Sequence, residues 1–165
     1  SDDMKLWVKA SVRMGDLNSL KLAGTNQLVS EDIIAKSIPI VRKFGNKGNN
    51  TYFIILTTSD INNSSANLRF VFSTHNKEQK ISVISLRRLV NYQHDKPVVD
   101  ELTVFRFYKM MKRAIGEIHL GWQRSTNPQD IMYAPIMSVD DIDNMTLEHH
   151  EPIPEPLNLF QKSNI

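Results

Sequence analysis

The residues best suited to chemistry stand in one predicted helix and in a segment near the end of the chain. Glu117 and His119 are close together in the helix, and His149 is followed directly by His150. Carboxylate and imidazole groups can exchange protons and bind metal ions. One glutamate with one histidine is nevertheless a poor zinc site, and adjacent histidines rarely chelate one ion without further ligands. We interpret His149-His150 as an exposed pair in a tail.

Other common chemistries are excluded by residue type. The chain has no cysteine, which removes thiolate nucleophiles, disulfides and cysteine-bound metals. None of its six glycines belongs to a phosphate-binding loop, and no nucleophile elbow of the Gly-x-Ser-x-Gly type is present. The carboxylates Asp140, Asp141 and Asp143 lie in a stretch typical of a solvated turn, where nothing would prepare them for acid–base catalysis.

Length and charge indicate one ordinary globular domain. The 165 residues carry a net charge of +2, which is too mild for a nucleic-acid-binding protein. We interpret the densest basic clusters as solvated faces with long apolar stems; they are Arg87-Arg88 and the group Lys109, Lys112 and Arg113. No apolar run approaches the roughly 18 residues of a membrane span, so none is expected. A cytoplasmic and a secreted location both stay open.

Hydrophobic patterns predict an α/β (α+β) domain with a mixed, twisted sheet of about four strands. Alternating or continuous β-favouring runs place these strands at residues 5–13, 51–58, 68–72 and 81–85. The polar stretches 73–80 and 91–97 are predicted loops, in which His75 and His94 would be solvated. A glycine- and asparagine-rich turn is expected at 45–50.

Two main helices are predicted to flank the sheet. One opens at Ser30, and the other is capped by Asp100 and continues to about Leu120. Three- and four-residue spacing predicts the buried stripe of the long helix as Val104, Phe107, Tyr108, Met111, Ile115 and Ile118. We expect a single domain over residues 1–150 and a proline-rich acidic tail over 151–165.

Three pieces, taken in order, resemble the archaemetzincin branch of the metzincin zinc peptidases. The first reads LTTSDI and NLRFVF, at residues 56–61 and 67–72, and the second reads ISVISLRRL, at 81–89. The third is the long helix, which stops at Gly121 and is followed by a polar turn and by Ile131-Met132-Tyr133. The resemblance covers roughly residues 5–150 and implies a zincin-like fold in which Met132 forms the Met-turn.

The resemblance also implies where a zinc site would lie. The family motif, His-Glu-x-x-His-x-x-Gly-x-x-His, supplies three zinc ligands and a general base. Aligning its glycine with Gly121 without gaps puts Ala114 and Ile118 at the helical histidines, Ile115 at the base and Arg124 at the third ligand. None of these side chains can ligate zinc, and an arginine repels it. On this alignment we expect no catalytic residue, no metal ligand and no cofactor.

A second alignment gives a rival hypothesis. It puts Gly116 at the first histidine and Glu117 at the catalytic glutamate, but it recovers His119 only by deleting residues inside the helix. The rival is then a working zinc peptidase with a non-standard ligand set of Glu117, His119 and one of His149 or His150.

The sequence therefore predicts a catalytically inactive metzincin-like domain that binds a protein or an extended peptide segment. The alternatives are the zinc-dependent metallopeptidase just described and a domain that binds a small molecule. Arg124 either pairs with Glu117 or Asp130 in the emptied site or is a solvent-facing loop arginine.

Overall fold

A three-stranded sheet forms the centre of the described chain. The computed structural model describes residues 17–43, 51–65 and 67–150. The sheet has the order β2 (Phe53–Thr57), β5 (Ile81–Ser85), β4 (Ser73–Asn76), with β2 parallel and β4 antiparallel to β5. The expected strands at 51–58 and 81–85 are therefore confirmed. The expected strand at 5–13, the turn at 45–50 and the tail at 151–165 lie outside the described residues.

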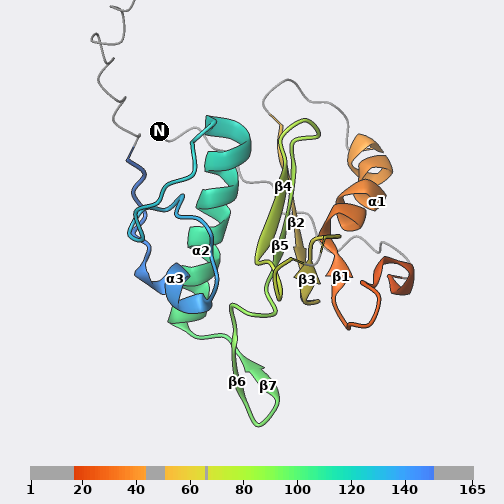
Figure 1. Cartoon of the computed structure of the whole chain (residues 1–165), viewed down its shortest axis with the longest axis horizontal. Helices are drawn as coiled ribbons and strands as arrows, with labels where there is room; N and C mark the ends of the chain where they lie inside the picture. Colours follow the sequence, from red (N-terminus) through yellow and green to blue (C-terminus); the bar gives the residue numbers. More distant parts are fainter. Residues whose placement is uncertain (1–16, 44–50, 66, 151–165) are drawn as a thin grey trace, which may run out of the picture.

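Two long helices cover the two faces of this sheet (Figure 1). Successive residues of a strand point to opposite faces, and β5 shows this directly. Val83 packs with the helix α1 (Ser30–Lys43), whereas Ile84 packs with the helix α2 (Glu101–Ile115). As predicted, the Asp100 side chain caps α2 and accepts a hydrogen bond from the Thr103 amide. Each face of the sheet thus has its own apolar core.

Several short elements complete the described chain. The α2 helix runs directly into a π-helical turn, η2 (Gly116–Leu120), and a short helix α3 (Val139–Asn144) packs against α2. The 3₁₀ turn η1 (Asn18–Leu20) precedes β1 (Leu28–Val29), which pairs in parallel with β3 (Ile61–Asn62). No helix of the described part combines the length and the apolar character that crossing a membrane requires.

The antiparallel strand lies later in the chain than expected. In place of a strand at 68–72, the structure has a single bridge between Ile61 and Val71, and β4 occupies the stretch predicted as a polar loop. The polar side chains of β4 have hydrogen-bond partners within the protein: those of Ser73, Thr74 and His75 bond to other side chains, and that of Asn76 accepts from the Gln79 amide. Thr74 Oγ1 donates to Ser30 Oγ over 2.7 Å, and Nδ1 of His75 lies 2.7 Å from Ser82 Oγ. Polar pairing, which apolar periodicity does not reveal, makes this strand possible.

The loop expected at 91–97 is instead a hairpin of β6 (Asn91–Gln93) and β7 (Lys96–Val98). Its two-residue turn is made by His94 and Asp95, both with positive φ, at 50° and 61°. Turns of this kind match the twist of the strands, and aspartate tolerates the left-handed conformation. Figure 1 shows the hairpin projecting from the sheet and helices.

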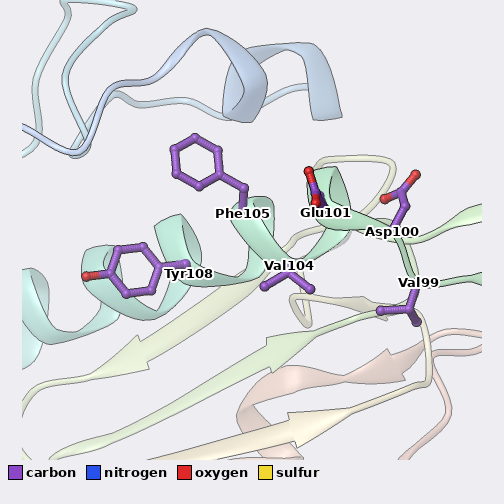
Figure 2. A pocket seen from close by; sticks show the side chains of 6 residues that line it. All are labelled: Val99, Asp100, Glu101, Val104, Phe105 and Tyr108. Carbon is purple, nitrogen blue, oxygen red and sulfur yellow. The ribbon is translucent and has the colours of Figure 1, made fainter.

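The buried face of α2 is only partly the predicted apolar stripe. Phe107 and Met111 pack onto the core, but the side of the helix that carries Val104 and Tyr108, which are 56% and 54% exposed, faces outward. The same side lines an open pocket of about 700 Å³ at the N-terminal end of α2 (Figure 2); its residues are Val99, Asp100, Glu101, Val104, Phe105 and Tyr108.

Basic residues of α2 take the buried positions, so the prediction that Lys109 and Arg113 lie on a solvated face was wrong. Lys109, only 2% exposed, donates from Nζ to the carbonyls of Ile142 and Asp143. Arg113 donates to the Ile131 carbonyl over 3.0 Å. Buried cations are tolerated when hydrogen bonds satisfy them; here α3 supplies the acceptors for Lys109, and the Ile131 carbonyl is the acceptor for Arg113.

Candidate functional site

The α2 helix changes geometry where the family motif would hold its metal. In η2 the Gly121 amide donates to the Gly116 carbonyl, a π-type bond that accommodates one residue more than an α-helical turn. Gly121 ends the helix with a φ of +67°, which glycine adopts without strain. The Trp122 amide then also donates to the Gly116 carbonyl, over 2.9 Å. The π turn therefore shifts the count of residues before Gly121 by one.

Because of this shift, two other residues face the chain that follows the helix. Arg113 and Glu117 are both buried and lie four residues apart, on one face of the helix. The guanidinium of Arg124 is 3.8 Å from Glu117 Oε1, and Lys77 Nζ, just after β4, is 3.9 Å from the same oxygen. We call Lys77, Arg113, Glu117 and Arg124 the Glu117 cluster. It joins one carboxylate to three cations.

Electrostatics within the Glu117 cluster follow from its burial. The pKa of Arg113 is lowered to about 10, chiefly by burial; the positive charge of Arg124 also lowers it, whereas Glu117 and Asp130 act in the opposite direction. Arg113 stays charged at neutral pH all the same. Arg113 and Arg124 thus both interact electrostatically with the Glu117 carboxylate.

The four positions that the gap-free alignment assigned to the zinc site do not gather in one place. Ala114 is completely buried in the core between α2 and the sheet, where Met110 and Ile84 surround it. Ile118 is buried and Ile115 is half-buried. Arg124 alone reaches the Glu117 cluster, and it pairs with Glu117, one of the two partners expected for it.

The rival ligand set does not come together. His119 is exposed, and its ring packs against Tyr52 with the centroids 4.5 Å apart, whereas Glu117 is buried beside Lys77 and Arg124. Across residues 17–43, 51–65 and 67–150, no group of three or more His, Cys, Asp or Glu side chains is arranged to hold a metal ion.

Asp130 is a buried carboxylate that the sequence hardly indicated. It accepts hydrogen bonds from the amides of Met132 and His150, each over 2.7 Å, and its Oδ1 lies 3.0 Å from His149 Nδ1. Burial alone would raise the pKa of Asp130, but these hydrogen bonds outweigh it and lower the pKa below the usual value. The one available signal was its place two residues before Met132, where an aspartate can bond its own backbone.

The expectation of an exposed His149-His150 pair is correct for His150 alone. His149 is buried, and its ring lies 4.9 Å from that of Trp122, centroid to centroid. Met132 is completely buried at the turn that Asp130 organises. The segments after η2 and after α3 therefore meet around Asp130, Trp122 and His149.

His75 lies in β4 and is far from the solvated state that the sequence predicted. Ser73 Oγ and Ser82 Oγ stand 3.1 Å and 2.7 Å from its two ring nitrogens. The pKa of His75 is lowered to about 3, chiefly by burial and in addition by the charges of Arg113, Arg124 and Lys77. The ring is therefore neutral at physiological pH, and the cations of the Glu117 cluster dominate the potential around it.

Gly116 leaves room for Trp122, and alanine should not fit in its place. A Cβ at position 116 would stand 2.2 Å from Cε3 of the Trp122 ring. We expect Gly116→Ala to displace the indole and lower the free energy of unfolding by about 2 kcal/mol, as overpacked sites do. Tryptophan fluorescence and urea denaturation measure both effects. An unchanged emission spectrum in Gly116→Ala would contradict the packing described.

The fold can be compared with known proteins. No protein-family model matches the chain, and no curated protein matches it. A zinc-dependent peptidase from Methanocorpusculum labreanum has a similar structure, with a TM-score of 0.65 and 21% identity over 76% of this chain and 71% of that one.

Two archaemetzincins are also similar. The protein from Archaeoglobus fulgidus, solved in complex with malonate, gives a TM-score of 0.58 and 21% identity over 82% of this chain and 73% of its own. The protein from Methanopyrus kandleri gives 0.56 and 19% over 75% of this chain. This chain spans only 60% of the Methanopyrus protein's length.

The comparison corrects one prediction. We expected no cofactor, but a solved structure with this fold is a zinc-dependent peptidase, so the fold points to zinc. The described side chains of the Glu117 cluster do not fit such an ion, because three cations surround the single carboxylate and repel a dication. The fold therefore favours a zinc ion, whereas the charges of the Glu117 cluster disfavour one.

The comparison confirms the resemblance and the fold class inferred from the sequence. The similarity covers three quarters or more of the chain in each case, and it includes a mixed sheet between helices. Sequence identities of 19–21% carry the fold and not the activity. The chain has an archaemetzincin-like metallopeptidase fold.

Proposed function

We propose that this chain is a catalytically inactive metzincin-like domain that binds an extended peptide segment of a protein partner. The observation that carries the proposal is the position of β4. It pairs with β5 on one side only, and among the described residues no strand pairs with its other side. An open strand edge offers backbone donors and acceptors to an added strand.

The register of β4 on β5 shows which residues of β4 have backbone groups that β5 does not pair. The Ser85 amide donates to the Phe72 carbonyl, and Thr74 and Asn76 are the alternate partners along the ladder. In an antiparallel ladder the residues between them turn their amides and carbonyls the other way. Ser73 and His75 therefore present hydrogen-bonding groups to a peptide.

A peptide on this edge would pass the Glu117 cluster. β4 contacts η2, and Lys77, directly after β4, reaches Glu117 Oε1 at 3.9 Å. The bound segment would thus run between the strand edge and the end of α2. Backbone pairing gives affinity, and side chains at the end of the strand would give selectivity.

The charges around Glu117 support the proposal that the domain is catalytically inactive. Hydrolysis requires an activated water and a base to take its proton. Glu117 is the carboxylate of the cluster, its side chain is 9% exposed, and two cations face one of its oxygens. A carboxylate held in this way is a structural ion-pair partner and is poorly placed as a general base.

The alternative, a zinc-dependent peptidase that uses Glu117 and His119, draws its support from the structural similarity to such an enzyme. The two functions are separated by incubating the full chain with a mixed decapeptide library, with and without added zinc. Mass spectrometry of the retained and released peptides gives binding and cleavage together. We expect retention of intact peptides in both conditions. Zinc-dependent cleavage that Glu117→Gln abolishes would establish the peptidase instead.

The strand edge itself is tested by Ser73→Pro, which removes an outward-facing amide while leaving the paired residues in place. We expect the Kd of a retained peptide to rise by about tenfold, as for one lost hydrogen bond. Ser73→Ala is the matched control because it keeps the amide and loses only the hydroxyl that contacts His75. Equal weakening by both variants would contradict binding at this edge.

A further inference from the structure

We propose that Lys77 and Arg124 bind a carboxylate of the peptide that occupies the β4 edge. The inference rests on the proposed function and adds the chemical class of its ligand. The site lies between the end of β4 and the segment after η2, where the two cations face Glu117 from different parts of the chain.

The Glu117 cluster carries more positive than negative charge. Lys77, Arg113 and Arg124 surround Glu117 alone, since Asp130, the next carboxylate, is already committed to His149 and to two backbone amides. Arg113 is buried, so water screens its charge poorly. An anionic group at the mouth of the cluster would offset the excess of positive charge.

The donors of the two outer cations are available. The side chains of Arg124 and Lys77 are 63% and 58% exposed, and their nitrogens stand 3.8 Å and 3.9 Å from Glu117. These separations are too long for hydrogen bonds. Within the described chain neither head group donates a hydrogen bond to another residue, so both keep their donors for a ligand. A guanidinium fork and an ammonium group together suit a carboxylate.

Glu117 itself uses only half of its capacity. Its Oε2 atom is buried and has no hydrogen-bond partner, while Oε1 faces both cations. Buried polar atoms without partners are rare and call for an explanation. Here the buried carboxylate attracts both Lys77 and Arg124 but accepts no hydrogen bond from either of them. Their donors therefore remain available for a second anion.

His75 keeps the charge of the site constant. Its ring is held between two serine hydroxyls, and its pKa of about 3 keeps it neutral above mildly acidic pH. Titration of His75 should therefore not change carboxylate binding between about pH 5 and 8.

The test uses four fluorescein-labelled versions of a peptide retained by the full chain. The versions carry either Glu or Gln at one internal position and end in either a free carboxylate or an amide. Fluorescence polarisation at fixed low salt gives each Kd. We expect at least one of the two carboxylates to tighten binding by about tenfold over the neutral version, as for charge-assisted hydrogen bonds. The arm that responds identifies the side chain or the terminus as the source.

Arg124→Gln and Lys77→Gln place the effect on this site. Each variant should bring the Kd of the acidic peptide to within about threefold of the neutral peptide measured on the same variant. Lys96→Gln is the control, because Lys96 is an exposed lysine in the β6–β7 hairpin and should leave the full difference.

The outcomes separate the two proposals. Equal affinity for all four peptides overturns the carboxylate site and leaves peptide binding intact. A preference for acidic peptides that survives in the double variant Arg124→Gln/Lys77→Gln also overturns it. If no peptide of any charge binds, the proposed function fails, and this inference fails with it.

Discussion

Replacing Asp130 by alanine should lower the free energy of unfolding by about 3–5 kcal/mol, the range for breaking a buried charged network. Asp130 is completely buried and accepts hydrogen bonds from the amides of Met132 and His150. Its Oδ1 also lies 3.0 Å from His149 Nδ1. Alanine would leave both amides without this acceptor, and the Met132 amide is buried. Urea denaturation, followed by circular dichroism, measures the change.

Two further variants sharpen this result. Asp140→Ala removes an exposed aspartate from α3 and should change the free energy of unfolding by no more than about 0.5 kcal/mol. Asp130→Asn keeps one acceptor oxygen but turns an amide donor toward the other partners, so an intermediate loss is expected. If Asp130→Ala were as stable as Asp140→Ala, the segments on either side of it would have to be held together by other contacts.

The Asp130 network should also be visible from the tryptophan beside it. His149 packs on Trp122, and Trp122 fills the space next to Gly116. Loosening Asp130 should therefore alter tryptophan emission before global unfolding, in the same direction as Gly116→Ala. Asp130→Ala and Gly116→Ala act on opposite sides of the Trp122 ring, which lies between Gly116 and His149.

Much of the fold could be predicted because the relevant signals are local. The β-favouring runs at 51–58 and 81–85 became β2 and β5, and Asp100 caps α2 as its type and position indicated. These elements follow from side-chain shape and backbone bonding within a few residues. Their order, with the Gly121 and Met132 segment, was enough to suggest the zincin-like fold.

The candidate site could not be predicted to the same degree, since it depends on distant partners. Arg113 is buried because the Ile131 carbonyl accepts from it, and no pattern within α2 reports that acceptor. The π turn before Gly121 adds one residue to the last turn of the helix, and a count of residues back from Gly121 does not reveal it. A one-residue change of backbone geometry is enough to rotate a helical face by about 100°.

The exposed apolar side of α2 illustrates the same limit. Val104 and Tyr108 have the spacing of a core stripe, but the helix turns Arg106 and Lys109 toward α3 because carboxylate and carbonyl oxygens gather there. The apolar periodicity identified a helix correctly and gave only part of its buried face. Periodicity ranks faces by side-chain polarity, whereas burial also depends on whether polar groups find partners.

Arg106→Met should lower the free energy of unfolding by about 3 kcal/mol, because it removes the buried arginine of a partly buried ion pair between α2 and α3. Nε and Nη2 of Arg106 donate to the two oxygens of Asp143, each over 2.7 Å, and Nη1 donates to the Leu89 carbonyl over 3.2 Å. The hydrogen bonds to Asp143 raise the pKa of Arg106 in spite of its burial. This bidentate geometry is the strongest that an arginine forms with a carboxylate.

A double-mutant cycle with Asp143→Asn separates the pair from the packing of the arginine stem. We expect a coupling free energy of about 2 kcal/mol for Arg106 with Asp143. The matched cycle on Arg88 and Asp60, also bidentate but with Arg88 40% exposed, should give no more than about 1 kcal/mol. Burial of the arginine is then the variable that distinguishes the two pairs, since the Asp143 and Asp60 side chains are both partly exposed, at 29% and 19%. Equal coupling in both cycles would mean that α3 is held to α2 chiefly by Lys109, whose Nζ donates to the carbonyls at the end of α3.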